Sequence, residues 1–112
     1  MNFAIVGCGH IAKKHAEAIE KIEGVNLIAV CDKVPQAMEE YVQKYGAKPY
    51  ENLAHMLNDP AIDVVNICTP SGLHASIAVA AAKAKKHVIV EKPIALTLED
   101  ADLMINTCKE NG

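Results

Sequence analysis

The feature that most constrains the fold is a regular alternation of short apolar runs with segments of helical periodicity. Each run stops at a glycine, a proline or a polar residue, as strands buried on both faces of a sheet do. The sequence predicts strands at 3–6, 25–31, 48–50, 63–68 and 87–91, and helices at 11–22, 35–44, 52–58, 73–85 and 97–111. Strands that alternate with helices are joined by right-handed crossovers into a parallel sheet. We therefore expect an α/β fold with a doubly wound parallel sheet in three αβα layers.

Local signals refine the helix ends. Asn52, Ser71 and Thr97 are of the types that cap helix N-termini, and Gly24 and Gly46 are of the type that ends helices. Helical spacing in the first helix predicts one shared buried face made of Ile11, His15, Ala18, Ile19 and Ile22.

Composition fits a single domain over residues 1–112 and argues against several classes of function. The core must be aliphatic, because 51% of the residues are hydrophobic but only 4% are aromatic. A net charge of −3, with 11 lysines and no arginine, disfavours nucleic-acid binding, which relies on neutralising phosphates. No apolar run is long enough to cross a membrane, and the N-terminus lacks the pattern of a signal peptide. We expect a cytoplasmic protein with reduced thiols that binds neither membrane nor nucleic acid.

Ligands of doubly wound sheets bind at the carboxyl ends of the strands, so the residues there are the candidates. The first strand runs directly into Gly7-Cys8-Gly9-His10-Ile11-Ala12, a G-x-G-x-x-A motif that also opens a helix. In such a motif the first glycine permits a tight turn, the second lets a pyrophosphate approach the backbone, and the small third residue lets helix and strand pack closely. The helix N-terminus then faces the phosphates. This context predicts a Rossmann dinucleotide-binding fold.

The second strand ends at Asp32, at the distance from the glycines that the dinucleotide fingerprint requires. A carboxylate there accepts hydrogen bonds from the adenosine ribose and repels a 2′-phosphate, which predicts NAD rather than NADP. The neighbouring Lys33 could partly offset that repulsion. The competing interpretation of Asp32 is a turn residue or a helix cap.

The next two strand ends carry a family resemblance. One is followed by Thr69-Pro70-Ser71-Gly72-Leu73-His74 and the other by Glu91-Lys92-Pro93. Together with the glycine motif and Asp32, these segments resemble the Gfo/Idh/MocA oxidoreductases along the whole chain. Within that family, the first and third strand-end motifs are similar to those of dehydrogenases that oxidise UDP-N-acetylglucosaminuronate-type sugars.

The resemblance implies a two-domain dehydrogenase that transfers hydride between nicotinamide and a hydroxyl of a sugar, nucleotide sugar or cyclitol. This chain matches only the cofactor domain, so the substrate domain of the family is absent and the chain alone is expected to be inactive. A homo-oligomer is expected, because the surface that the second domain would cover is partly apolar.

The resemblance also assigns roles to individual residues. Lys92 would lie near the nicotinamide and the reacting carbon, where a cation can polarise an alkoxide or relay its proton. Glu91 would shape the backbone, and Thr69, Pro70 and His74 would line the ribose and nicotinamide region, although His74 could equally be an ordinary helix residue. The complete predicted cofactor site comprises Gly7, Gly9, His10, Ile11, Ala12, Asp32, Lys33, Thr69, Pro70, His74, Glu91 and Lys92.

Two alternatives remain open from the sequence. The fold could serve a non-enzymatic nucleotide-sensing or interaction domain, because a fold alone does not define a function. Cys8, Cys31 and Cys68 all lie near strand ends and, with His10, could bind zinc, but their spacing matches no metal motif and we expect no metal. Cysteine is also a common small buried residue.

Overall fold

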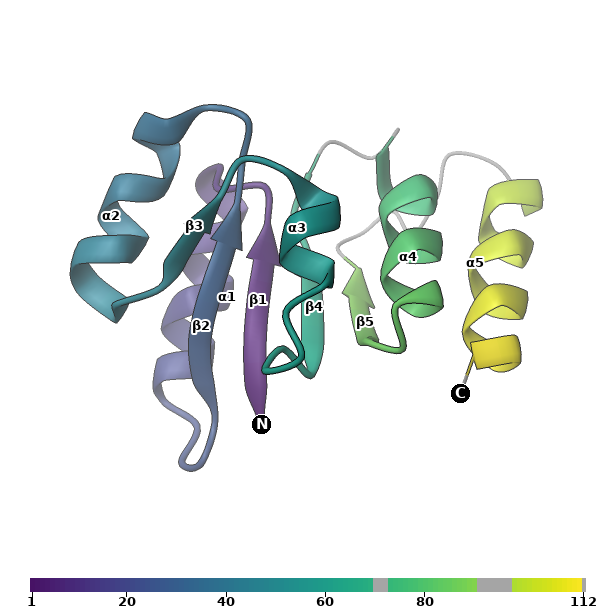
Figure 1. The fold of residues 1–112 in the computed structure, drawn as a ribbon, viewed down its shortest axis with the longest axis horizontal. Helices are drawn as coiled ribbons and strands as arrows, with labels where there is room; N and C mark the ends of the chain where they lie inside the picture. The colour runs from purple at the N-terminus through teal and green to yellow at the C-terminus, as the bar shows by residue number, and fades with distance from the viewer. Residues whose placement is uncertain (70–72, 91–97, 112) are drawn as a thin grey trace.

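The computed structural model describes residues 1–69, 73–90 and 98–111 and contains one parallel sheet flanked by helices (Figure 1). The strands are β1 (Asn2–Val6), β2 (Asn26–Cys31), β3 (Lys48–Tyr50), β4 (Val64–Ile67) and β5 (His87–Val90). The helices are α1 (His10–Glu20), α2 (Pro35–Tyr45), α3 (Leu53–Leu57), α4 (His74–Lys83) and α5 (Leu98–Asn111). The predicted α/β class, the parallel sheet and the order of elements are confirmed.

The strand order β3-β2-β1-β4-β5 places β1 at the centre of the sheet. β2 and β3 lie on one side of β1, and β4 and β5 lie on the other side, so β1 pairs with both β2 and β4. In such a sheet the ligand site lies where the strand order switches, outside the carboxyl ends of the central strands. The topology therefore predicts a ligand site at the carboxyl ends of β1, β2 and β4.

Two apolar cores lie on opposite faces of the sheet. Ile5 and Val30 point into one core with residues of α1 and α2, whereas Ala4 and Val65 point into the other with residues of α3, α4 and α5. In Figure 1 α3 lies in front of the sheet and α1 behind it. The three expected layers are thus formed, because alternate residues of strands buried on both faces point to opposite helix layers.

Some element ends agree with the predicted signals. Pro35 opens α2, and Gly46 ends it with a φ of 67°, in the left-handed region that favours glycine. Asn52 caps α3, since its side-chain oxygen accepts a hydrogen bond from the His55 amide at 3.1 Å. Ser71 and Thr97 lie outside the described residues.

The end of α1 was predicted incorrectly. The helix ends at Glu20 with Lys21 as its C-cap, so Gly24 belongs to the following turn. Ile22 consequently leaves the helical face and is 52% exposed. Ala18 of the predicted face is also exposed, and the buried residues of α1 are Ala12, Ala16 and Ile19. The small alanine side chains allow α1 to lie close to the sheet.

The fifth strand is less buried than predicted. Val88 and Val90 pack on the core beneath α4 and α5, but His87 and Ile89 on the opposite face are exposed. The expectation of a strand buried on both faces is therefore wrong for β5. It is one of the two edge strands of the described sheet, and α1 and α2 cover the sheet nearer to β1 and β2.

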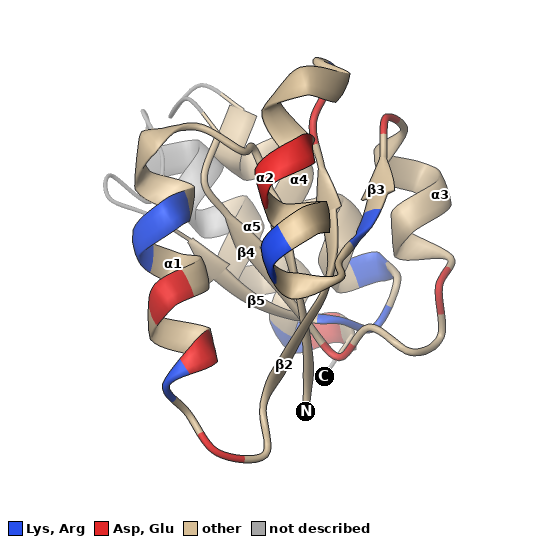
Figure 2. Ribbon diagram, turned by 90° about the vertical axis from the view of Figure 1, so that its left-hand side faces the viewer, with Lys and Arg blue, Asp and Glu red and all other residues tan. Residues whose placement is uncertain are grey.

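The outer surface of the helices carries charges of both signs, as Figure 2 shows for α1 and α2. Lys13 of α1 and Glu40 of α2 form a salt bridge of 3.4 Å, with both side chains more than half exposed. In the described part of the chain, no helix is both long and apolar enough to span a membrane.

Candidate functional site

A cavity of about 360 Å³ opens at the carboxyl edge of the sheet. The ends of β1, β2 and β4 form its floor, and residues of α3 and α4 form part of its wall. It is lined by Val6, Gly7, Cys31, Asp32, Lys33, Glu51, Leu53, Thr69, Leu73 and Ile77. The structure thus brings together the predicted site residues Gly7, Asp32, Lys33 and Thr69.

Gly7 is required by the fold itself. Its φ is +89°, and its amide donates a hydrogen bond of 2.8 Å to the Cys31 carbonyl. A Cβ atom at this position would lie 2.9 Å from both the amide nitrogen and Cγ2 of Thr69. No side chain fits between the turn after β1 and the end of β4, which explains the first glycine of the motif.

Gly9 serves a different purpose. Its backbone is extended, with a φ of −82°, and among the described residues no heavy atom lies within 4 Å of the place a Cβ would occupy. As the N-cap of α1 it has no side chain to accept from the first amides of the helix, and the first turn holds no acidic residue. These open amides and the positive end of the helix dipole fit a phosphate group.

The remaining motif residues follow from the path of α1. Ala12 is fully buried and packs in the core between α1 and the sheet. His10 is exposed and Ile11 is partly buried, and both stand in the first turn of the helix, where their amides face the carboxyl edge. The chain can therefore present backbone N–H groups to a pyrophosphate without a side chain in the way.

Asp32 is held in place by two backbone amides. Its Oδ2 accepts from the Cys8 amide at 2.9 Å, and its Oδ1 accepts from the Val34 amide at 2.9 Å. The carboxylate thereby joins the glycine loop to the end of β2. The turn-residue interpretation and the ribose-binding interpretation of Asp32 are compatible, because each carboxylate oxygen has a further lone pair for a ligand.

His74 lies inside the protein. It is 1% exposed, and its Nε2 is 2.8 Å from the Thr69 carbonyl oxygen. This contact ties the start of α4 back to the segment that follows β4. Thr69 itself lines the cavity, and its buried Oγ1 has no hydrogen-bond partner among the described residues. Pro70, Glu91 and Lys92 lie outside the described residues.

Six residues that line the cavity were not among the predicted site residues, and two of them, Val6 and Cys31, are simply the last residues of β1 and β2. Glu51 follows β3 and so reaches the same edge as Asp32, a position that could have been found by extending the strand-end rule to the third strand. Leu53 comes from α3, and Leu73 and Ile77 stand four residues apart at the start of α4. Their apolar side chains suit a flat, uncharged ring such as adenine.

The cysteines do not form a metal site in the described part of the chain, where no group of three metal-ligating side chains converges. Cys8 and Cys68 belong to the core on the α1 side of the sheet, whereas Cys31 belongs to the core on the α4 side. Burial, and secondarily the nearby Asp32 carboxylate, raises the pKa of the Cys8 thiol to about 12. Such a thiol stays protonated near neutral pH, whereas metal binding and redox chemistry require the thiolate.

The family can be assigned from a comparison with known proteins. Residues 1–112 match the model of the GFO_IDH_MocA oxidoreductase family, described as an NAD-binding Rossmann fold. The chain belongs to the Gfo/Idh/MocA family. This confirms the resemblance read from the strand-end motifs and identifies the chain as a nicotinamide-dinucleotide-binding Rossmann domain.

Individual relatives agree with this assignment. Myo-inositol 2-dehydrogenase of Thermotoga maritima is 36% identical over 111 residues, which cover 98% of this chain and 33% of that protein. The WlbA dehydrogenase of Bordetella pertussis, solved with NADH and UDP-GlcNAcA, superposes with a TM-score of 0.95 at 38% identity, over 100% of this chain and 33% of that one. Biliverdin reductase of Synechocystis, solved with NADP+, superposes with a TM-score of 0.91 at 32% identity, over 99% of this chain and 35% of that one.

The Gfo/Idh/MocA domain described here spans about a third of the length of the relatives it matches. Those relatives include several dehydrogenases, so the comparisons do not favour the non-enzymatic alternative. Structural relatives carry either NADH or NADP+ in the same fold. The fold alone therefore accommodates either cofactor.

Proposed function

We propose that this domain binds NAD(H) in preference to NADP(H). The observation that carries the proposal is the position of the Asp32 carboxylate on the cavity beside the glycine loop. Such a carboxylate accepts from both ribose hydroxyls of the adenosine but repels a 2′-phosphate. Lys33 on the same cavity supplies only one positive charge.

The described residues fit the parts of a dinucleotide one by one. Gly9 and the first amides of α1 would receive the pyrophosphate, and Asp32 the ribose. Leu53, Leu73 and Ile77 would pack against the adenine. Thr69, whose buried hydroxyl has no hydrogen-bond partner among the described residues, would lie nearer to the nicotinamide half, together with Pro70.

We further propose that the domain is the cofactor half of a cytoplasmic, homo-oligomeric dehydrogenase that also has a substrate domain. The substrate would be a sugar, nucleotide sugar or cyclitol with an oxidisable hydroxyl. Support comes from the relatives named above, one of which was solved with a nucleotide sugar and another of which acts on an inositol. The bound nicotinamide would supply the hydride chemistry.

Lys92 is proposed as a catalytic residue, with Glu91 and Pro93 holding the backbone around it. Its ammonium group would stabilise the alkoxide that develops on the substrate or help to move its proton. In a longer chain that carries both domains, Lys92→Ala should lower turnover much more than NADH affinity. Equal loss of both, or loss of neither, would count against the catalytic role.

The first test is a titration of the 112-residue chain with NADH and with NADPH, followed by cofactor fluorescence, since the chain has no tryptophan. We expect saturable binding of NADH that is at least about tenfold tighter than binding of NADPH. A tenfold difference in affinity is on the order of the energy of one charge–charge repulsion. Equal affinities would contradict the preference for NAD, and binding of neither would contradict the proposed site.

A further inference from the structure

Glu51 stands beside Asp32 at the carboxyl edge of the sheet, although the two are far apart in the sequence. The parallel pairing of β2 with β3 sets Cys31 opposite Tyr50, and the Asp32 amide donates to the Tyr50 carbonyl at 3.1 Å. The residues that follow these two strands are therefore neighbours across the ladder. Asp32 and Glu51 both line the same cavity as Lys33.

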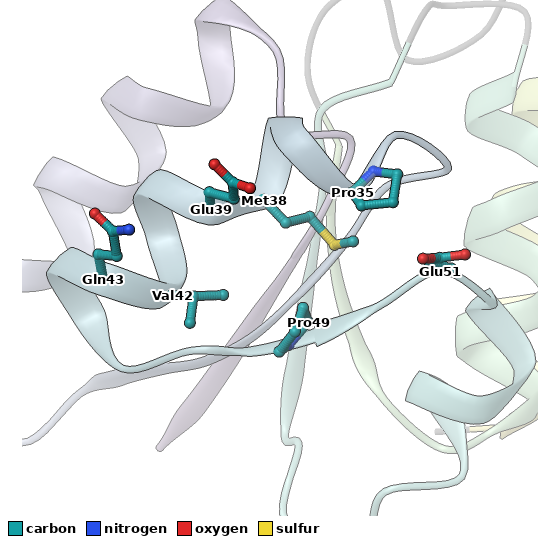
Figure 3. A pocket seen from close by; sticks show the side chains of 7 residues that line it. All are labelled: Pro35, Met38, Glu39, Val42, Gln43, Pro49 and Glu51. Atoms are coloured by element: carbon teal, nitrogen blue, oxygen red, sulfur yellow. The ribbon is translucent and has the colours of Figure 1, made fainter.

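The Glu51 side chain is exposed, and among the described residues its carboxylate has no hydrogen-bond or ion-pair partner. This distinguishes it from Asp32, whose two oxygens are already engaged by backbone amides. Figure 3 shows Glu51 just after β3, facing a second hollow between α2 and β3 that Pro35, Met38 and Glu39 also line. Glu51 thus stands on the rim between the two hollows.

The charges on this rim do not balance. Among the described residues that line the cavity, Asp32 and Glu51 are carboxylates and Lys33 is the one cation, which leaves one net negative charge where the adenosine ribose would lie. A phosphate on that ribose adds between one and two further negative charges. Its repulsion by Glu51 acts through water and so falls with salt.

We propose that Glu51 is a second determinant of cofactor choice, which disfavours a 2′-phosphorylated dinucleotide independently of Asp32. The inference rests on the proposed dinucleotide site and concerns its specificity. It assigns to Asp32 the binding of the ribose hydroxyls and to Glu51 only a repulsive role. Removal of the Glu51 charge should therefore help NADPH without harming NADH.

The test compares Glu51→Gln, which keeps the size of the side chain, with Glu51→Lys, which reverses its charge. Dissociation constants for NADH and NADPH are measured by cofactor fluorescence at about 20 mM salt, where surface charges are weakly screened, and at about 300 mM salt, where they are strongly screened. Glu51→Gln should tighten NADPH binding about three- to tenfold and change NADH binding less than about twofold, and Glu51→Lys should tighten NADPH binding further. The gain should shrink at high salt.

Glu39→Gln is the matched control, because Glu39 lines only the second hollow and its loss changes the net charge by the same amount. The ratio of its dissociation constants for NADPH and NADH should equal that of the wild type. If Glu51→Gln and Glu51→Lys leave the ratio unchanged, or shift it no more than Glu39→Gln does, the inference is overturned while NADH binding still supports the proposed site. If the wild type binds neither dinucleotide, the proposed function fails and this inference fails with it.

Discussion

The amide of Cys8 donates a hydrogen bond of 2.9 Å to Oδ2 of Asp32, across 24 positions of the sequence. Asp32, which is expected to bind the ribose, thus also holds in place the glycine loop that is expected to bind the pyrophosphate. Because the second oxygen of Asp32 accepts from the Val34 amide, one side chain fixes the conformation of two consecutive parts of the site.

Replacement of Asp32 should accordingly do more than change cofactor preference. Asp32→Ala removes two charge-assisted hydrogen bonds and should lower the free energy of unfolding by about 2 kcal/mol. It should also weaken the binding of both NADH and NADPH, because the glycine loop loses the hydrogen bond that holds it. Urea unfolding and titrations with the two cofactors check this. Asp32→Asn keeps one acceptor, so its stability and affinities should lie between those of the wild type and those of Asp32→Ala. An Asp32→Ala variant of unchanged stability would show that the anchor is unimportant.

The two glycines of the loop should respond differently to alanine. Gly7→Ala forces a side chain into a positive φ and against Thr69, and should cost about 2–4 kcal/mol of stability. Gly9→Ala meets no described atom and should cost less than about 1 kcal/mol. Gly9→Ala should nevertheless weaken the binding of NADH at least about tenfold, since the methyl group would occupy the place of the phosphate.

Thermal unfolding and NADH titration of the two variants provide the measurement. Each serves as the control for the other, because both add one methyl group to the same loop. A Gly9→Ala variant that binds NADH normally would argue against the pyrophosphate site, and a stable Gly7→Ala variant would argue against the close approach to Thr69.

Lys85 is a site at which stability can be gained. It follows α4 with a φ of 66°, the one non-glycine residue in the left-handed region among those described. Lys85→Gly should raise the free energy of unfolding by about 1 kcal/mol. The control is Lys83→Gly, inside the last turn of α4, which should lower it by up to about 1 kcal/mol. Urea unfolding distinguishes the two, and the same sign for both would refute the explanation.

Stability should fall in alkaline solution because of buried groups that ionise. Burial raises the pKa of Cys8 from its ordinary 9.0 to about 12 and that of Tyr41 from 10.0 to about 12. The unfolded chain therefore loses these protons at lower pH than the folded chain does. Their contribution is complete below about pH 9 and is lost as the pH rises towards 12.

This can be measured by urea unfolding under reducing conditions at several pH values between about 8 and 11. Cys8→Ala removes one of the two groups and should give a shallower decline of stability with pH than the wild type. Parallel declines for the two proteins would mean that Cys8 ionises alike in the folded and unfolded states.

Much of the local architecture was predictable because the relevant forces act between near neighbours in the chain. The cap from Asn52 to the His55 amide and the helix start at Pro35 depend on residues within one turn. The prediction failed for Ile22, because helical periodicity continues in the sequence beyond the point at which the helix ends. It failed for β5 because the exposure of Ile89 depends on which elements cover that strand.

By itself, the sequence determined the alternation of strands and helices, the glycine loop and the position of Asp32 at a strand end, since periodicity and turn chemistry are local. Only the tertiary structure decided what these residues meet. The strand order brings Glu51 beside Asp32, turns His74 inward to the Thr69 carbonyl, and places Cys31 in a different core from Cys8 and Cys68. Contacts across a sheet depend on strand order and register, and these are set by the packing of the whole chain.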